Sequence, residues 1–280
     1  MVERDAWLQE RARCRGQRGM TAAPTLSEAR LDRFARHIVL PEIGGAGQVA
    51  LARRHLVLIG LGGIGSPALQ YLAAAGIGKL TLVDDDRVEL SNLQRQTLYT
   101  TRDIGHGKAV IAKRWITGFD PELDVTISDR RIDAANAEAL VRDADLVLDG
   151  TDTFATRLAV SDACVRTGIP LMAAAVGRFQ GQVGAFAGHR ADQACYRCFV
   201  GDAFDADDCD TCAEDGMLGA MAGWTASFAA MQSIRALLDG VTDYGGAQWG
   251  TVHLMDGMAP AMRSFRISKD PACRGCGSRG

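Results

Sequence analysis

A glycine-rich turn set between apolar runs constrains the fold of this chain more than any other feature of its sequence. Residues 55–60 (HLVLIG) form a compact apolar run, and the motif GLGGIG occupies residues 60–65. The next segment, 66–76, has a proline in its first turn and a glycine at its end, which is typical of a helix. A second apolar run follows at residues 79–84. This order predicts a strand, a tight turn, a helix and a second, parallel strand.

The turn and the end of the second strand carry residue types that bind a nucleotide. Glycines in a G-x-G-x-x-G pattern let the backbone approach a phosphate at a helix N-terminus, where negative charge is favoured. Asp84 lies 19 residues after Gly65, at the place where an acid binds ribose hydroxyls. The predicted contacts are Gly60, Gly62, Gly63, Gly65 and Asp84. The motif alone leaves NAD, FAD, the adenosine of S-adenosylmethionine and ATP as alternatives.

Strand-like and helix-like segments alternate along most of the chain. This alternation predicts an α/β fold with a doubly wound, mostly parallel Rossmann-like sheet. Beyond about residue 177 the pattern changes to a polar loop at 189–215, a long apolar helix at 217–238 and a C-terminal antiparallel extension at 249–256 and 261–267. The other predicted strands are 123–128, 145–150, 169–176 and 181–188, and the other predicted helices are 27–40, 46–54, 108–118, 134–142 and 154–166.

Composition narrows the class of protein. Of the 280 residues, 47% are apolar and 23% are charged, which is ordinary for a globular chain. The formal net charge of −3 gives no electrostatic reason to expect a nucleic acid or a membrane surface as partner. No apolar run approaches the ~18 residues of a membrane helix, and the N-terminus has no secretory apolar region. We therefore expect a cytoplasmic protein with a mobile N-terminal extension at residues 1–25.

Three polar positions distinguish between the possible nucleotides. SNLQRQ occupies residues 91–96, Lys108 opens a predicted helix, and Asp152 follows the third buried strand. In an open α/β sheet, these places face the crevice at the carboxyl ends of the strands. Arg95 and Lys108 suit phosphate oxygens, and Asn92 supplies a hydrogen-bond donor. Asp152 is a hard carboxylate suited to Mg²⁺. The set favours a triphosphate, although a surface arginine and a solvated lysine are the plain alternatives.

Six of the eight cysteines occur in three C-x-x-C pairs, which is typical of metal or thiol chemistry. The pairs are Cys195/Cys198, Cys209/Cys212 and Cys273/Cys276. The first and last pairs are separated by 74 residues (199–272) and indicate one tetrahedral zinc site. A redox dithiol or a disulfide is the alternative.

Taken together, these motifs resemble those of the ubiquitin-activating-enzyme-like superfamily. The resemblance rests on GLGGIG, LTLVDDDRVELSNLQRQ, GHGK, LVLDGTD and the CYRC and CRGC pairs, and extends from about Leu31 to the C-terminus. The chain is most similar to bacterial sulfur-carrier-protein adenylyltransferases of the molybdopterin-synthase and thiazole-biosynthesis types. The resemblance implies that ATP and Mg²⁺ are used to adenylate the terminal carboxylate of a small ubiquitin-fold carrier protein ending in Gly-Gly. Pyrophosphate leaves, and sulfur then converts the acyl adenylate to a thiocarboxylate.

The resemblance also implies roles for individual residues. Gly63 and Asp84 match ribose and backbone contacts. The implied phosphate cradle consists of Ser91, Asn92, Arg95 and Lys108. Asp152 matches the Mg²⁺ ligand, and Thr153 stands where the family often has asparagine. Arg36 matches an arginine that reaches the ATP of a partner subunit, which implies a two-fold homodimer. The structural zinc is implied at Cys195, Cys198, Cys273 and Cys276, where it would tie down the C-terminal tail.

The remaining C-x-x-C pair leaves several interpretations open. Cys212 matches the family's transfer cysteine, which takes the activated carrier as a thioester or an acyl disulfide, and a plain loop thiol is the alternative. Cys209 departs from the family pattern. It is incidental, or it resolves a disulfide or persulfide on Cys212, or the pair competes for the zinc. Because the chain ends soon after the last pair, we expect a separate protein to donate the sulfur.

The chain is therefore expected to form one adenylation domain over residues 26–280. Its nucleotide-binding part spans about 55–176, and its loop, zinc and C-terminal part spans about 177–280. An ATP-dependent tRNA threonylcarbamoyladenosine dehydratase of the same superfamily is the first alternative, although such proteins generally lack the paired cysteines. An NAD-dependent dehydrogenase would have no use for SNLQRQ or for the paired cysteines. A non-catalytic subunit would not need the residues that are predicted to bind ATP. The carrier, the pathway and the sulfur donor depend on partners and not on this fold.

Overall fold

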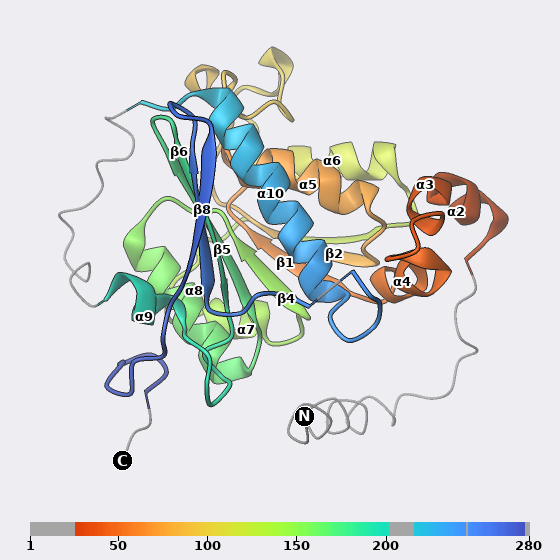
Figure 1. Ribbon diagram of the computed structural model, residues 1–280. Coiled ribbons are helices and arrows are strands. Elements are labelled where there is room, and N and C mark those ends of the chain that lie inside the picture. The colour runs from red at the N-terminus through yellow and green to blue at the C-terminus, as the bar shows by residue number, and fades with distance from the viewer. Residues whose placement is uncertain (1–25, 202–215, 245, 278–280) are drawn as a thin grey trace.

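An eight-stranded mixed sheet organises the chain in the computed structural model (Figure 1). The structure describes residues 26–201, 216–244 and 246–277. Across the sheet the strands lie in the order β3-β2-β1-β4-β5-β6-β7-β8. Their bounds are β1 His55–Ile59, β2 Lys79–Val83, β3 Asp124–Ser128, β4 Leu146–Asp149, β5 Leu171–Gly177, β6 Gln180–Phe186, β7 Thr251–Asp256 and β8 Ala261–Arg266. Every predicted strand is present, with ends shifted by no more than a few residues.

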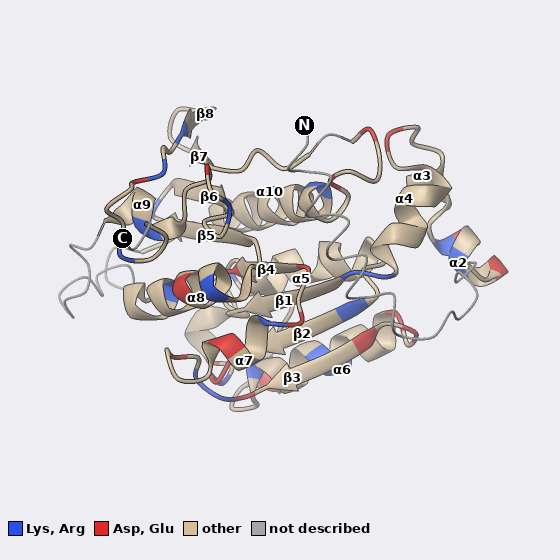
Figure 2. Ribbon diagram, turned by 90° about the horizontal axis from the view of Figure 1, so that it is seen from below, with Lys and Arg blue, Asp and Glu red and all other residues tan. Residues whose placement is uncertain are grey.

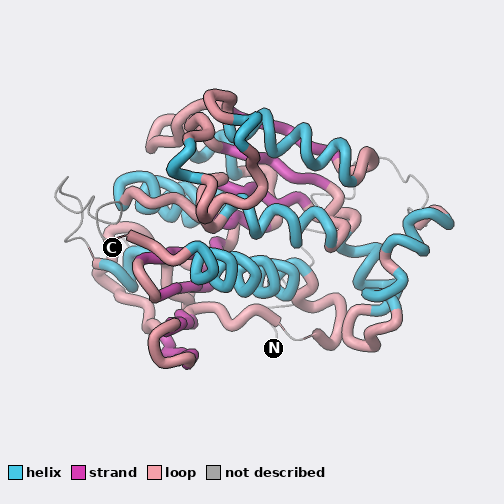
Figure 3. The backbone as a smooth tube through the Cα atoms, turned by 90° about the horizontal axis from the view of Figure 1, so that it is seen from above, coloured by secondary structure: helices cyan, strands magenta, loops and turns pink. Residues whose placement is uncertain are grey.

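The strands β3, β2, β1, β4 and β5 run parallel to one another. Strands β1 and β4 lie inside the sheet and are buried almost throughout, which explains their continuous apolar sequences. The helices that follow the first four strands of the chain are α5 Gly65–Ala74, α6 Lys108–Phe119, α7 Ala137–Val141 and α8 Phe154–Thr167. Helices lie on both sides of the sheet (Figure 3). These features confirm the predicted doubly wound α/β fold.

Alternate residues of each central strand enter two separate cores. Leu56 and Leu58 of β1 point into a cluster that also contains apolar residues of α5, α6 and α10 (Gly219–Leu237). Val57 and Ile59 point into a second cluster with residues of α7 and α8. Because the side-chain period of a strand is two, one apolar strand supplies both layers. The sheet is therefore covered on both faces where the predicted nucleotide unit lies.

The predicted C-terminal antiparallel extension is also confirmed. Strand β6 pairs antiparallel with β5, β7 with β6, and β8 with β7. Helix α10 crosses β5 and β6 and packs beside α5 (Figure 1). Within the described ranges, no helix is both long enough and apolar enough to cross a membrane.

The N-terminal helix predicted over 27–40 is wrong as a single element. It consists of α2 Glu28–Arg33 and α3 Ala35–Ile38, separated at Phe34. Ser27 caps α2 through its hydroxyl, which accepts a hydrogen bond from the backbone N–H of Arg30. Phe34 leaves helical geometry, with φ −101° and ψ 12°, and its ring packs over Gly76 just after α5. The next helix, α4, spans Gly44–Leu51.

The polar loop predicted over 189–215 is not wholly irregular. A short helix, α9 Tyr196–Val200, lies inside it and begins directly after Cys195. Two single 3₁₀ turns, η1 Leu90–Asn92 and η2 Thr101–Asp103, occur in the segment between β2 and α6. The predictions for residues 1–25 and for Cys209 and Cys212 lie outside the described residues.

Replacement of Gly65 should strongly destabilise this fold. A Cβ atom at Gly65 would lie 1.8 Å from the carbonyl oxygen of Gly60, so the backbone of the turn would have to move. We expect Gly65→Ala to lower the free energy of unfolding by more than about 2 kcal/mol in urea titrations. Gly118→Ala is the matched control, because a Cβ there meets nothing within 4 Å in α6. It should leave stability unchanged or slightly higher; equal losses in both variants would contradict the packing argument.

Candidate nucleotide site and four-cysteine cluster

The glycine turn lies at the carboxyl ends of β1 and β4. Gly60 has a φ of +81°, and a Cβ there would lie 3.0 Å from the backbone carbon of Gly150, directly after β4. The two loops therefore touch through their backbones. Gly62 and Gly63 face the SNLQRQ segment instead, because added Cβ atoms would lie 3.6 Å from Gln96 Nε2 and 3.4 Å from Arg95 Cδ. The turn thus contacts two of the three predicted polar positions.

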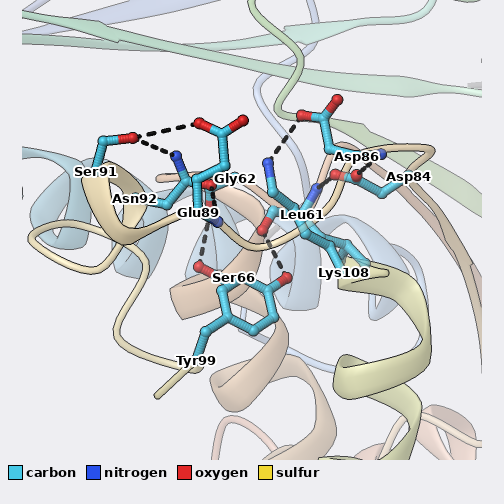
Figure 4. A network of polar contacts seen from close by, with 10 residues as sticks. All are labelled: Leu61, Gly62, Ser66, Asp84, Asp86, Glu89, Ser91, Asn92, Tyr99 and Lys108. Atoms are coloured by element: carbon cyan, nitrogen blue, oxygen red, sulfur yellow. Dashed lines mark hydrogen bonds and ion pairs between the residues drawn. The ribbon is translucent and has the colours of Figure 1, made fainter. Parts of the chain in front are cut away.

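Asp84 fixes the start of this turn. Its two carboxylate oxygens accept hydrogen bonds from the backbone N–H groups of Leu61, at 2.6 Å, and Asp86, at 2.9 Å (Figure 4). Burial raises the pKa of Asp84 above its ordinary value, while nearby Lys108 and the two backbone hydrogen bonds oppose the shift. Each carboxylate oxygen retains a second lone pair for a ligand hydroxyl.

A buried tyrosine supports the same turn and was not predicted from the sequence. The hydroxyl of Tyr99 donates a hydrogen bond of 2.9 Å to the carbonyl of Leu61 (Figure 4). Burial raises the pKa of Tyr99 above its ordinary value, so the hydroxyl keeps its proton. The sequence offers no signal for this contact, because Tyr99 lies in an irregular segment with no periodic pattern.

Lys108 starts α6 and points back toward the glycine turn. Its Nζ atom lies 2.8 Å from Oδ2 of Asp86, and its backbone N–H donates to the carbonyl of Asp86. The lysine side chain is only 6% exposed, whereas that of Asp86 is 68% exposed. The buried cation is therefore oriented by an exposed carboxylate. Sequence reasoning missed Asp86, although its position two residues after Asp84 was a usable signal.

The SNLQRQ segment forms one side of the site. Asn92 is buried and caps η1, since its Oδ1 accepts a hydrogen bond of 3.3 Å from the N–H of Glu89. Ser91 is exposed beside it, and its hydroxyl lies 3.4 Å from both Asn92 Nδ2 and Glu89 Oε2. Arg95 donates from Nη1 to the carbonyl of Ser91 at 3.0 Å. The segment is held by its own side chains and lies against Gly63.

The loop after β4 presents Asp152 to solvent. The preceding Thr151 donates two hydrogen bonds to Oδ1 of Asp149, from its N–H at 2.9 Å and its hydroxyl at 2.7 Å. Thr153 is the residue directly before α8, and its hydroxyl donates a hydrogen bond of 2.8 Å to that of Thr156. The exposed carboxylate of Asp152 is therefore carried by a loop in which the neighbouring side chains are hydrogen-bonded.

The structure brings most of the predicted nucleotide residues to one edge of the sheet. The glycine turn, Asp84, Lys108 and the Asp152 loop all lie at the carboxyl ends of parallel strands, where α/β proteins bind ligands. Arg36 lies elsewhere. It is exposed on α3, next to Phe34, which packs at the far end of the ten-residue α5. That helix is about 15 Å long, so Arg36 is separated from the glycine turn of its own chain.

The four predicted metal ligands form a compact cluster. All four Sγ atoms lie within 4.8 Å of one another. The distances are 3.9 Å for Cys195–Cys198, 3.6 Å for Cys195–Cys273 and 3.4 Å for Cys198–Cys276. Thiolates at ~2.3 Å from a tetrahedral zinc ion lie about 3.8 Å apart, so the cluster fits zinc. The four cysteines are free thiols, which disagrees with the disulfide alternative.

One thiol of the cluster is more acidic than a free cysteine. A hydrogen bond from the Cys195 thiol lowers the pKa of Cys198 below its ordinary value, and the backbone N–H of Asp270 assists at 3.4 Å. A thiolate is the form that binds zinc. The cluster joins the C-terminal tail to the beginning of α9, as predicted for a tail with few apolar anchors.

Comparison with known proteins adds to this geometry. Residues 34–275 match the ThiF family. The chain belongs to this family. The chain is 37% identical over 256 residues to the SAMP-activating enzyme E1 of Haloferax volcanii. The aligned region covers 91% of this chain and 92% of the relative. The chain is 35% identical over 252 residues to the molybdopterin-synthase adenylyltransferase of Escherichia coli K12, covering 90% and 98% of the two chains.

A third ThiF-family relative and two solved structures extend the likeness. The sulfur carrier protein adenylyltransferase of Thermus thermophilus is 37% identical over 250 residues, covering 88% of this chain and 91% of the relative. A crystal structure of E. coli MccB with succinimide has a TM-score of 0.74 and 22% identity, covering 91% of this chain and 75% of the other. A structure of PaaA has a TM-score of 0.73, also at 22% identity, with 91% and 78% coverage. At these identities, the solved structures support the fold alone.

Zinc content tests the assignment of the cluster. We expect the purified protein to hold one zinc ion per chain by elemental analysis, because four thiol ligands complete a tetrahedral structural site. Cys273→Ser should lose most of this zinc. The double variant Cys209→Ser/Cys212→Ser should keep it. Zinc lost from the double variant but retained in Cys273→Ser would show that the other C-x-x-C pair supplies ligands.

Proposed function

We propose that this chain is an adenylyltransferase that activates the C-terminal glycine of a small ubiquitin-fold sulfur-carrier protein ending in Gly-Gly. A carboxylate oxygen of the carrier attacks the α-phosphorus of ATP, and the bond to the β-phosphate oxygen breaks. The products are an acyl adenylate and pyrophosphate. A separate protein then donates sulfur to form the thiocarboxylate. The observation that carries this proposal is the contact between the glycine turn and the loop of Asp152, with Lys108 buried beside Asp84 and Asp86, in a member of the ThiF family.

The names of the relatives support the substrate class. Of the three relatives named above, one is described as an activating enzyme and two as adenylyltransferases. The names of the two adenylyltransferases specify a sulfur carrier protein and molybdopterin synthase. The alignments cover nearly the whole of each partner, so the likeness is not confined to a nucleotide-binding half. Residues 26–280 are proposed to act as one adenylation domain, with the nucleotide part at about 55–176.

The reaction brings a carboxylate up to a triphosphate, so the site must neutralise charge and align the two groups. Lys108 donates one hydrogen bond to Asp86, which leaves two N–H groups of its ammonium for phosphate oxygens. Arg95 lies beside Gly63 and supplies a second cation. Gly60, Gly62, Gly65, Ser91 and Asn92 complete the proposed phosphate and backbone contacts. Asp84 is proposed to accept hydrogen bonds from the ribose.

Asp152 and Thr153 are proposed to serve the metal side of the site. The exposed carboxylate of Asp152 is a suitable Mg²⁺ ligand, and Thr153 supplies a hydroxyl beside it. Bound Mg²⁺ would neutralise phosphate charge. Zinc at the four cysteines is proposed to be structural. Cys212 is proposed as a transfer cysteine, and we place the reaction in the cytoplasm, where zinc-binding thiols remain reduced.

Pyrophosphate exchange tests the proposed reaction. We expect incorporation of labelled pyrophosphate into ATP only with a carrier whose terminal glycine is intact. Lys108→Ala and Asp152→Ala should each lower the exchange rate by about 100-fold or more, because each removes charge stabilisation at the triphosphate. Lys113→Ala, on the exposed side of the same helix α6, is the matched control and should retain the rate. Absence of exchange with every carrier, together with tRNA-stimulated ATP hydrolysis or tight NAD binding, would instead support one of the alternatives.

A two-fold homodimer is proposed because one face of the molecule is apolar and Arg36 lies far from the site of its own chain. Helices α5 and α10 carry a single charged residue between them, Arg235 (Figure 2). Tyr71 is 57% exposed on α5 and Met231 is 43% exposed on α10. A groove of about 350 Å³ lies beside them and is lined by Arg95 and Trp224, among others. We propose that a partner subunit packs here and that its Arg36 completes this site.

Subunit complementation tests this arrangement. We expect Arg36→Ala and Lys108→Ala each to be inactive alone, and an equal mixture after subunit exchange to recover about a quarter of the wild-type exchange rate. Half of the dimers in the mixture are mixed, and each mixed dimer has one site with both side chains. A mixture of Lys108→Ala with Asp152→Ala is the control and should stay inactive if both residues serve the same chain. Recovery in that control, or none in the first mixture, would contradict the shared site.

A further inference from the structure

We propose that the four-cysteine cluster and the Asp152 loop are energetically coupled through a buried chain of Tyr196 and Arg157, so that zinc at the cluster strengthens MgATP binding and MgATP strengthens zinc binding. This inference rests on the proposed nucleotide site and adds regulation by metal occupancy to it. Arg157 acts as a positioning residue for the loop and not as a catalytic one.

Arg157 lies at the centre of this chain. It belongs to α8 and is only 7% exposed. Its Nη2 donates to the carbonyl of Thr151, in the loop after β4, and to the carbonyl of Ala174 in β5 at 2.9 Å. The side chain of Tyr196 lies beside this guanidinium and raises the pKa of Arg157. One buried cation therefore joins the Asp152 loop, the sheet and the segment that carries the cysteines.

Asp149 also binds the loop that carries Asp152. It is fully buried at the end of β4, and its Oδ1 accepts both the N–H and the hydroxyl of Thr151. Its Oδ2 has no hydrogen-bond partner among the described residues, so the positive charge of Arg157 nearby compensates the buried carboxylate. The N–H, hydroxyl and carbonyl groups of Thr151 are all used. The position of the next residue, Asp152, therefore depends on where Arg157 lies.

Tyr196 connects this arrangement to the metal cluster. It follows Cys195 directly, is 2% exposed, and its ring makes an edge-on contact with Phe186 at 5.6 Å between centroids. The helix that begins at Tyr196, α9, has only five residues and precedes residues 202–215. So short a helix does not form stably by itself. Its geometry depends on the turn from Cys195 to Cys198, which a bound zinc ion would hold.

A second contact lets the polar link be removed without detaching the cluster. Arg197 binds Asp162 of α8 through two hydrogen bonds, from Nε at 2.8 Å and from Nη2 at 3.0 Å. Figure 1 shows α9 beside α8. Because this bidentate pair anchors α9 to α8 independently of the tyrosine hydroxyl, Tyr196→Phe removes the hydroxyl beside Arg157 while leaving the ring and the anchor in place.

Equilibrium competition with a zinc chelator tests the coupling in the zinc-loaded protein. We expect saturating MgATP to raise the apparent zinc affinity of the wild type at least about five-fold. By linkage, the Kd for MgATP measured by calorimetry should rise by the same factor when zinc is removed. Tyr196→Phe should still bind one zinc ion per chain but lose the coupling, with a ratio close to one. Arg157→Lys should behave in the same way.

Arg166→Lys is the matched control. It is the same substitution on the same helix, at an exposed arginine paired with Glu138, and it should keep the full coupling. No effect of MgATP on zinc affinity in the wild type, or full coupling in Tyr196→Phe, would overturn the proposal. Pyrophosphate exchange on the same samples distinguishes a failure of the coupling from a failure of the proposed function. Exchange without coupling rejects only the coupling, whereas failure to bind MgATP rejects the proposed function as well.

Discussion

The backbone of Gly60 lies against that of Gly150, and the remainder of the candidate site depends on this contact. A side chain at Gly60 would separate the loops that follow β1 and β4, and one at Gly65 would collide with the carbonyl of Gly60. Because β2 and β4 both run parallel to β1, Asp84 and Asp152 come to the same edge of the sheet. Asp84 and Tyr99 then brace the turn by binding the N–H and the carbonyl of Leu61.

The cysteine cluster lies in a different part of the sequence from the candidate nucleotide site. Its pairs come from the beginning of α9 and from the C-terminal tail, beyond the antiparallel strands. Helix α8 connects the two regions, since its first turns carry Arg157 and its middle carries Asp162. The same helix therefore packs against the Asp152 loop at one point and the cluster at another. This arrangement gives the tail a physical connection to the candidate nucleotide site.

Much of the fold could be predicted from the sequence because its central strands are buried on both faces. Continuous apolar runs such as 55–60 and 145–150 need no tertiary information to be read as strands. Short elements were less predictable. The break at Phe34 coincides with a contact to Gly76. Helix α9 carries Cys198, whose cluster partner Cys273 lies 75 positions further along the chain. Local sequence carries no record of such distant partners.

The sequence by itself determined the chemistry that is available: a glycine turn before a helix, an acid after the second strand, a lysine at the start of a helix, and four cysteines in two pairs. Residue type and spacing are local properties, so these features needed no coordinates. Only the tertiary structure decided which groups meet. It set Asp86 against Lys108, Tyr99 against the glycine turn and Arg157 between two loops, and it placed Arg36 away from its own site. These contacts join segments that are distant in the chain, and only the packing of helices against the sheet brings such segments together.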